Sequence, residues 1–287
     1  MIVATLLWSM AGVVTRHLES ANGVEATFWR SFFNAVALLF LLARLRGSRA
    51  LAKTLLSGDR TLWLSGLCWA AMFTAFMVAI TMTTVANVLV TMAIAPLVTA
   101  LFARFALGHR LPLRTWAAIV VAGMGIAWMY AHELAAVEGR HVAGTMIALA
   151  VPLAAALNWT AIQRSRSGSA DLLAAVLIGA TLSALLTFGA ALPMRATAHD
   201  LALLAVLGVF QLAVPCLIAV AAARVLAAAE AALLSLLEVV FGVCWTWLGA
   251  AEAPSRYVLV GGALVIGALV ANESIALQQR RVVANAT

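Results

Sequence analysis

The sequence predicts an all-α polytopic membrane protein with ten transmembrane helices. Its mean hydropathy is +1.06, and only 10% of its 287 residues are charged. Soluble domains carry about 25% charged residues, so this composition points to a lipid environment. Apolar runs also recur along the whole chain, most of them close to the roughly 20 residues that a helix needs to cross a bilayer. These runs leave no room for a separate soluble domain.

The ten predicted spans are separated by short polar or basic segments. The first span lacks the basic n-region and the small-residue cleavage site of a signal peptide, so we expect it to remain as a helix. Cys68, Cys216 and Cys244 fall inside spans without neighbours at metal-ligand spacing, which predicts packing roles and no bound metal or cofactor. The spans cover residues 2–17, 26–43, 61–82, 84–103, 112–131, 142–162, 171–192, 201–223, 226–249 and 255–275.

The net charge of +7 is distributed unevenly between the two sides of the predicted membrane. If the N-terminus is inside, only four basic residues fall in the outer connections. Because positive charge gathers in cytoplasmic loops, the sequence predicts that both termini are cytoplasmic. The basic residues then orient helices against an anionic leaflet, and no nucleic-acid partner is expected. The predicted inner segments that carry basic residues are 44–60, 104–114, 164–166, 224 and 280–281.

The two halves of the chain, residues 1–135 and 136–287, are predicted to be related five-helix repeats. The stretch "TTVANVLVTMAIAPLVTALFARFALGHRLPLR" from residue 83 aligns with "LAAAEAALLSLLEVVFGVCWTWLGAAEAPSR" from residue 226. With a shift of 142 beyond the loop, Gly125 corresponds to Gly267. Because five spans is an odd number, the second repeat is expected to be inverted relative to the first.

Polar and aromatic side chains recur at helical spacing inside the spans. In the fourth span, Thr84, Asn87 and Thr91 lie on one helical face. The shift of 143 places Glu230 and Glu238 on the equivalent face of the ninth span, so both faces are expected to line one central cavity. The other candidate lining residues are Thr5, Trp8, Trp69, Phe73, Phe76, Asn158, Trp159, Gln163, Gln211 and Trp245.

This lining suits a small amphiphile with a hydrophobic or aromatic side chain. The alternative is purely structural, because threonines in membrane helices often bond their own backbone and tryptophans often pack between helices. Pro96, Pro152 and Pro215 each remove a backbone hydrogen bond, so they are candidate hinges as well as candidate packing kinks.

Three charged residues inside spans are candidates for coupling or gating. Glu238 lies near the middle of the ninth span, where an ionised acid costs at least about 2.5 kcal/mol. It is a candidate proton-sensitive gate, or alternatively a neutral acid that ties two helices together. Glu230 has Arg224 as a candidate salt-bridge partner. Arg30 is expected either to snorkel to the surface or to hold a substrate carboxylate.

Four segments carry a resemblance to a known superfamily: "LLWS" at 6–9, "FWRSFFNAVALLFL" at 28–41, "APLVTALFARFALGHRL" at 95–111 and "SLLEVVFGVCWTWLGAAE" at 235–252. With them the chain resembles the EamA-type carriers of the drug/metabolite transporter superfamily over its whole length, and most closely the YddG-type exporters of aromatic amino acids. The resemblance implies two five-helix repeats around a central cavity. The chain departs from the family pattern at Gly108-His109, where Gly-Glu is usual, and at Val239, where proline is frequent.

Together, these features predict a secondary transporter of the bacterial cytoplasmic (inner) membrane. We expect it to export amino acids, especially aromatic or hydrophobic ones, or related metabolites by alternating access. The alternative is a multidrug exporter for lipophilic cations that is proton-coupled through Glu238. The sequence contains no P-loop, HExxH or GxSxG motif, so an enzyme is not expected. Glycines in the fifth and tenth spans leave both a monomer and a homodimer open.

Overall fold

The computed structural model describes residues 1–57, 59–107, 112–135, 139–164, 172–222, 237–251 and 253–286. Within these ranges every regular element is a helix, and none is a strand. The helices up to residue 135 are α1 (Ile2–Trp8), α2 (Met10–Thr15), α3 (Gly23–Arg46), α4 (Ser48–Leu56), α5 (Arg60–Met82), α6 (Val85–Met92), α7 (Ala95–Leu107) and α8 (Leu113–Ala135).

The remaining helices follow from residue 139 onward. They include one short 3-10 helix, η1, and one π-helix, η2. Their bounds are α9 (Gly139–Ala148), α10 (Ala150–Arg164), α11 (Leu172–Phe188), η1 (Gly189–Ala191), α12 (Ala198–Val206), η2 (Leu207–Ala213), α13 (Val214–Ala222), α15 (Leu237–Ala250) and α16 (Arg256–Ala286).

The chain is a polytopic membrane protein. Among the described residues, six helices are long and apolar enough to cross a bilayer: Gly23–Arg46, Arg60–Met82, His141–Asn158, Leu173–Ala191, Ala198–Ala219 and Arg256–Gln279. Shorter apolar helices coincide with the other four predicted spans, at Ile2–Thr15, Val85–Thr99, Leu113–Gly125 and Leu237–Ala250.

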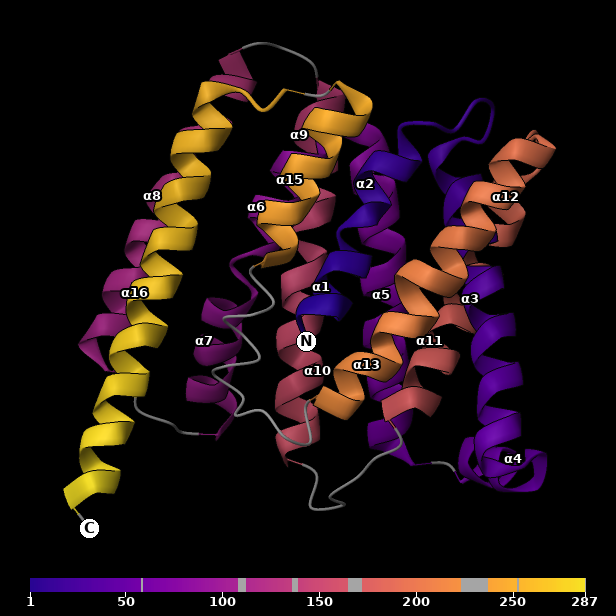
Figure 1. Cartoon of the computed structure of the whole chain (residues 1–287), viewed down its shortest axis with the longest axis horizontal. Helices are drawn as coiled ribbons and strands as arrows, with labels where there is room; N and C mark the ends of the chain where they lie inside the picture. Colours follow the sequence, from indigo (N-terminus) through magenta and orange to yellow (C-terminus); the bar gives the residue numbers. More distant parts are fainter. Residues whose placement is uncertain are drawn as a thin grey trace.

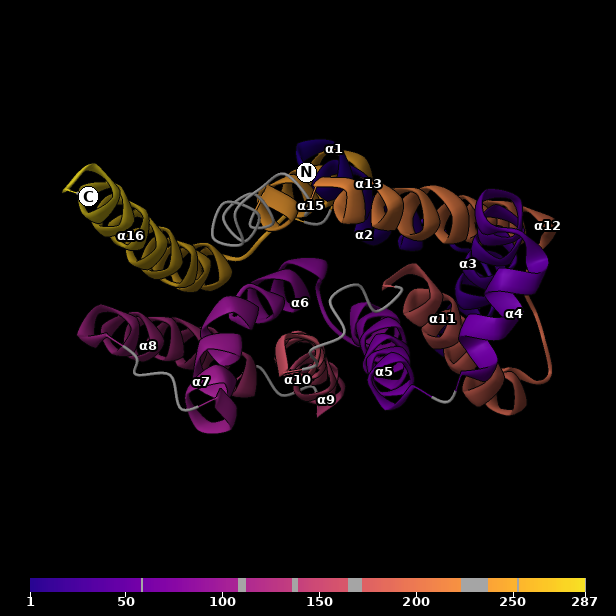
Figure 2. The ribbon, with the colours of Figure 1, turned by 90° about the horizontal axis from the view of Figure 1, so that it is seen from below.

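Seen from below, the helices form two rows (Figure 2). One row contains α16, α15, the α1–α2 pair, the α12–η2–α13 run and α3. The facing row contains α8, α7, the α9–α10 pair, α5 and α11, with α6 lying between the rows. Helices at corresponding places in the two predicted repeats therefore face each other across the bundle.

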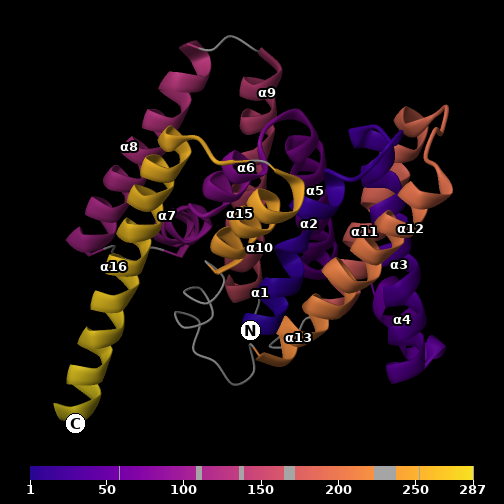
Figure 3. The same cartoon turned by 45° about the horizontal axis from the view of Figure 1, so that its top comes forward.

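The facing helices α8 and α16 illustrate how closely the rows pack. They lie side by side and run in opposite directions (Figures 1 and 3). A Cβ built on Gly125 would stand only 2.7 Å from the carbonyl oxygen of Gly261, so the two backbones approach each other where a side chain is absent. Nearer the other end, Thr115 Oγ1 donates a hydrogen bond to Asn272 Oδ1 at 3.0 Å.

Three predicted spans are interrupted beside their prolines. Proline cannot donate to the carbonyl four residues earlier, and its ring clashes with that carbonyl. For Pro96 this carbonyl belongs to Met92, the last residue of α6, and for Pro152 it belongs to Ala148, the last residue of α9. For Pro215 it belongs to Gln211, which lies within the π-helix η2.

The first predicted span is also divided, at Ser9, although it contains no proline. Ser9 Oγ donates to the carbonyl of Leu6 at 2.8 Å, a bond within the helix that often accompanies bending. The sequence does not predict this interruption.

The end of α3, helix α4 and the C-terminus lie at the lower end of the bundle in Figure 1, and basic residues occur in the helix segments at this end. This distribution follows the charge asymmetry noted in the sequence. The basic residues at helix ends or in α4 on this side include Arg44, Arg46, Arg49, Lys53, Arg60, Arg104 and Arg114.

Candidate substrate site

A fully buried arginine lies inside the bundle. Arg30 lies seven residues into α3, about 10 Å along the helix from its first residue. Only 1% of its surface is exposed, and its Nε and Nη1 atoms have no hydrogen-bond partner. Its guanidinium carbon is 5.4 Å from the centre of the Phe76 ring. Arg30 therefore does not snorkel to the surface, and no carboxylate among the described residues pairs with it.

A buried amide accompanies the arginine one helical turn later. Asn34 is fully buried, and both polar atoms of its side chain lack a hydrogen-bond partner. Residues four apart lie on the same face of a helix, so Arg30 and Asn34 share one face of α3. The sequence reasoning did not select Asn34, although its spacing from Arg30 was a usable signal.

A glycine brings α3 and η2 into close contact beside these two residues. A Cβ on Gly208 would stand 2.8 Å from the carbonyl oxygen of Arg30 and 2.8 Å from the backbone nitrogen of Asn34. Both are backbone atoms of α3, which cannot rotate away as a side chain could. The absence of a side chain at Gly208 thus allows η2 to lie directly against the Arg30–Asn34 segment.

Gln211 lies one turn after Gly208 in the same π-helix. Its Nε2 donates to the carbonyl oxygen of Trp8 at 3.1 Å, whereas its Oε1 is buried without a partner. Trp8 is the last residue of α1, so this bond reaches the point where the first span is interrupted. π-Helical turns often occur at functional sites, because they expose backbone groups and reorient side chains.

Aromatic side chains pack against the η2–α13 run that carries Gln211, and Phe76 contacts Arg30. Trp8 and Trp69 pack against the buried cluster that contains Phe73, Leu212 and Cys216. The ring centres of Trp69 and Phe73 are 5.4 Å apart. We call the resulting set the Arg30 cluster: the polar residues Arg30, Asn34 and Gln211 with the aromatic residues Trp8, Trp69, Phe73 and Phe76.

Five of the predicted lining residues are thus in the Arg30 cluster: Trp8, Trp69, Phe73, Phe76 and Gln211. The cluster combines a cation, two amides and four aromatic rings inside the membrane-spanning bundle. Such a set can bind a small molecule with one anionic group and one apolar or aromatic group.

The predicted polar stripe of the fourth span makes hydrogen bonds within its own helix and to the residue that caps α5. Thr91 Oγ1 donates to the Asn87 carbonyl at 2.7 Å, and Asn87 Nδ2 donates to Thr83 Oγ1 at 3.1 Å. In the first span, Thr5 Oγ1 donates to the Ile2 carbonyl at 2.8 Å. These bonds match the structural alternative for the stripe, and the stripe's role in a cavity stays a prediction.

The remaining predicted site residues are not part of the Arg30 cluster, and some lie outside the described residues. Glu238 is the second residue of α15 and is partly exposed, and Trp245 is 39% exposed. Asn158 is buried in α10, and its Oδ1 has no partner. Glu230 and its candidate partner Arg224 lie outside the described residues, as do the side chains of Trp159, Gln163 and Pro96.

A hydroxyl network ties three helices together near the Arg30 cluster. Ser183 Oγ on α11 is 2.9 Å from Ser31 Oγ on α3 and 2.9 Å from Thr74 Oγ1 on α5. Hydroxyl bonds of this kind hold membrane helices together where the hydrophobic effect cannot. Ser31 follows Arg30 directly, so the network fixes the segment of α3 that carries the arginine.

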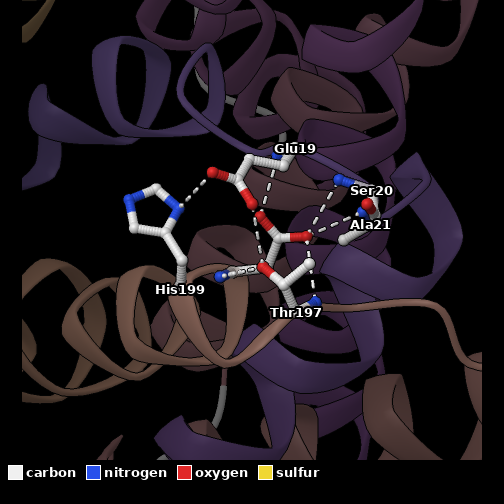
Figure 4. A network of polar contacts seen from close by, with 6 residues as sticks. Glu19, Ser20, Ala21, Thr197 and His199 are labelled. Carbon is white, nitrogen blue, oxygen red and sulfur yellow. Dashed lines mark hydrogen bonds and ion pairs between the residues drawn. The ribbon is translucent and has the colours of Figure 1, made fainter.

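At the upper end of the bundle a second polar group joins two distant connections (Figure 4). The Asp200 carboxylate accepts hydrogen bonds from the backbone nitrogens of Glu19, Ser20 and Ala21 at 2.8–3.0 Å, and from Thr197 at 3.3 Å. The exposed Glu19 and His199 form an ion pair at 3.7 Å.

Glu19, His199 and Asp200 place ligand atoms within 4.8 Å of one another, a spacing that a metal ion could bridge. However, both Asp200 oxygens already accept backbone hydrogen bonds.

A second buried carboxylate, that of Glu25, also accepts hydrogen bonds from the backbone of a distant segment. Its Oε1 accepts from the backbone nitrogens of Arg195 and Ala196 at 2.8 Å. Together these contacts fasten α3 and the segment before it to the α11–α12 connection.

Comparisons with known proteins agree with this architecture. Residues 1–131 match the EamA-like transporter family. Eleven chains of solved structures match, and one crystal structure shares 20% sequence identity and a TM-score of 0.61 over 95% of each chain. Comparison with curated proteins finds no match. The first part of the chain is therefore similar to EamA-like transporters, and the chain as a whole shares its fold with a solved structure.

Proposed function

We propose that the protein is a secondary transporter of the cytoplasmic membrane that carries amino acids with hydrophobic or aromatic side chains. The similarity of residues 1–131 to EamA-like transporters supports transport. The single observation that carries the substrate class is the Arg30 cluster, with unpartnered polar atoms beside four aromatic rings in the interior of a membrane bundle. Buried polar atoms without a hydrogen-bond partner destabilise a membrane protein, so their presence favours a role in binding a ligand.

We further propose that transport proceeds by alternating access between two inverted five-helix halves, with both termini cytoplasmic. The opposite directions of α8 and α16 and the facing rows of helices support this arrangement (Figures 1 and 2). The interruptions beside Pro96, Pro152 and Pro215 supply points where half-helices can pivot. The basic residues at the lower end favour the cytoplasmic side for that end.

The multidrug alternative is less compatible with the Arg30 cluster. A lipophilic cation would be repelled by the buried guanidinium, because like charges repel strongly where water is excluded. A cation site would have to lie elsewhere, for example beside the partly exposed Glu238. We therefore favour amino acids, with the narrower likeness to YddG-type exporters as a prediction.

The test is uptake into proteoliposomes with purified protein and labelled L-phenylalanine, L-tryptophan, L-leucine, L-glutamate and tetraphenylphosphonium. We expect saturable flux of the first three and none of the last two. Protein-free liposomes give the background. Saturable flux of tetraphenylphosphonium alone would establish the multidrug alternative, and no flux of any amino acid would refute the proposal.

Proton coupling is tested in the same vesicles by imposing a pH gradient. If Glu238 couples transport to protons, Glu238→Gln will remove the effect of the gradient and leave downhill exchange intact. A gradient effect that survives in Glu238→Gln would exclude this residue as the coupling group.

A further inference from the structure

We infer that Arg30 binds the α-carboxylate of the transported substrate, and that the amide oxygens of Asn34 and Gln211 accept hydrogen bonds from its ammonium group. This inference rests on the proposed function, because it specifies how an amino acid is held at the Arg30 cluster. It assigns the zwitterionic head of the substrate to the polar residues and its side chain to the aromatic ones.

The first step of the argument is the charge of Arg30. Its side chain is 1% exposed, and no described carboxylate lies within salt-bridge distance. A guanidinium stays protonated in proteins, so Arg30 is a buried positive charge that no acid among the described residues neutralises. An anionic ligand would supply the missing charge.

The second step is the geometry of the donors. Carboxylates bind guanidinium groups through two parallel N–H bonds, either along the Nε–Nη2 edge or along the Nη1–Nη2 edge. Nε and Nη1 both lack partners, so each edge has at least one donor available. The guanidinium carbon also lies over the Phe76 ring, 5.4 Å from its centre, so a cation–π contact accompanies these unpartnered donors.

The third step is the supply of acceptors. Gln211 Nε2 donates to the Trp8 carbonyl, which fixes the orientation of the amide. Its Oε1 has no partner, and an amide oxygen can only accept a hydrogen bond. Asn34 has both amide atoms unpartnered and can contribute a second acceptor. An ammonium group carries three N–H donors and would satisfy both oxygens. A carboxylic acid without an ammonium group would leave the amide oxygens of Asn34 and Gln211 unpaired. An amine without a carboxylate would place a second positive charge beside Arg30, with no anion to neutralise either charge.

The closing experiment first compares four ligands on the wild-type protein. Tryptophan fluorescence of the purified protein in detergent reports binding of L-phenylalanine, 3-phenylpropionate, phenethylamine and L-phenylalaninamide. We expect L-phenylalanine to bind best, 3-phenylpropionate at least tenfold more weakly, and the two ligands without a carboxylate not to bind measurably. Binding of phenethylamine as tight as that of L-phenylalanine would overturn the inference without any variant.

Two variants then test the residues directly. Arg30→Gln is expected to weaken L-phenylalanine binding at least 100-fold. The second variant, Asn34→Asp, keeps the test decisive if Arg30→Gln fails to fold. It places a carboxylate one turn from Arg30 on the same helical face, where it can pair with the guanidinium in place of the substrate. We expect Asn34→Asp to raise the melting temperature and to lower L-phenylalanine affinity at least tenfold. Arg256→Gln, an exposed arginine at the upper end, is the matched control and should bind as wild type does.

The outcomes separate the two proposals. If wild-type vesicles carry no amino acid, the proposed function fails and this inference fails with it. If wild-type vesicles carry L-phenylalanine and Asn34→Asp keeps both the wild-type affinity and the wild-type KM, only the carboxylate assignment is overturned. A folded Arg30→Gln variant with wild-type affinity leads to the same conclusion.

Discussion

Replacing Gly208 with alanine is expected to push η2 away from α3 and to weaken both folding and transport. The new Cβ would stand 2.6 Å from Phe33 Cβ and 2.8 Å from the Arg30 carbonyl oxygen and the Asn34 nitrogen. Ordinary contacts begin at 3.4 Å. The two helices must therefore separate by about 0.6–0.8 Å, and overpacking of this kind costs about 1–3 kcal/mol.

The matched control is Gly267→Ala, a second helical glycine in a membrane span. A Cβ on Gly267 would meet no atom within 4 Å. Alanine is favoured over glycine in helices by up to about 1 kcal/mol, so this variant should be unchanged or slightly more stable. The two substitutions are chemically identical, and only the structure predicts opposite effects.

The assay is thermal unfolding in detergent, followed by tryptophan fluorescence, together with the KM for L-phenylalanine in proteoliposomes. Gly208→Ala should lower the melting temperature by several degrees and raise KM, because Arg30 and Asn34 move with the α3 backbone. If Gly208→Ala matches Gly267→Ala in both measurements, η2 does not lie against α3 as described, and the Arg30 cluster loses its structural basis.

Three further substitutions test other parts of the structure. Asp200→Asn should destabilise the protein by about 1–3 kcal/mol, measured by thermal unfolding, because the amide cannot accept all four backbone hydrogen bonds. Ser183→Ala should cost about 0.6–1.7 kcal/mol by the same measurement, because it removes the hydroxyl that bridges α3 and α5. Pro215→Ala should lower the maximal transport rate more than it changes KM, because the restored N–H can bond the Gln211 carbonyl and straighten the helix.

Each of the three substitutions has a control variant that leaves the tested contact in place. Glu19→Gln removes the charge from the exposed pair with His199 and keeps an amide oxygen that can still accept from Thr197 Oγ1, so stability should change by less than about 1 kcal/mol. Thr181→Val removes a hydroxyl that bonds its own helix, and Pro112→Ala lies at an exposed position before α8. Equal effects of a variant and its control would contradict the contact assigned to that variant.

The periodic features of the fold were predictable from the sequence. The lengths of the apolar runs were enough to locate the long helices. Lipid offers no hydrogen-bond partners, so every span must satisfy its backbone groups internally and forms a helix. The interruptions at Met92 and Ala148 follow directly from the prolines four residues later, because the loss of the N–H is a local effect. The sequence also marked Trp69, Phe73 and Phe76 as candidate lining residues because they recur at helical spacing, and their role in lining a cavity stays a prediction.

The polar contacts between distant segments were not predictable. Ser31 and Ser183 are 152 residues apart, and neither lies in a pattern that marks the other. The same holds for Glu25, which meets the backbone of Arg195 170 residues later. For Arg30, the sequence left snorkelling and burial open, because the direction of its side chain depends on which face of α3 packs against η2 and α5.

Gln211 connects the proposed binding site to the helix interruptions, and this connection gives a physical route from binding to movement. Its backbone carbonyl is the one that Pro215 cannot bond, so the helix is weakened at this residue. Its side chain bonds the last carbonyl of α1, where the first span is interrupted. A substrate ammonium on its Oε1 would therefore act on both interruptions at once. Because a ligand shifts a conformational equilibrium only through contacts that differ between the states, residues at such junctions are where binding energy can drive alternating access.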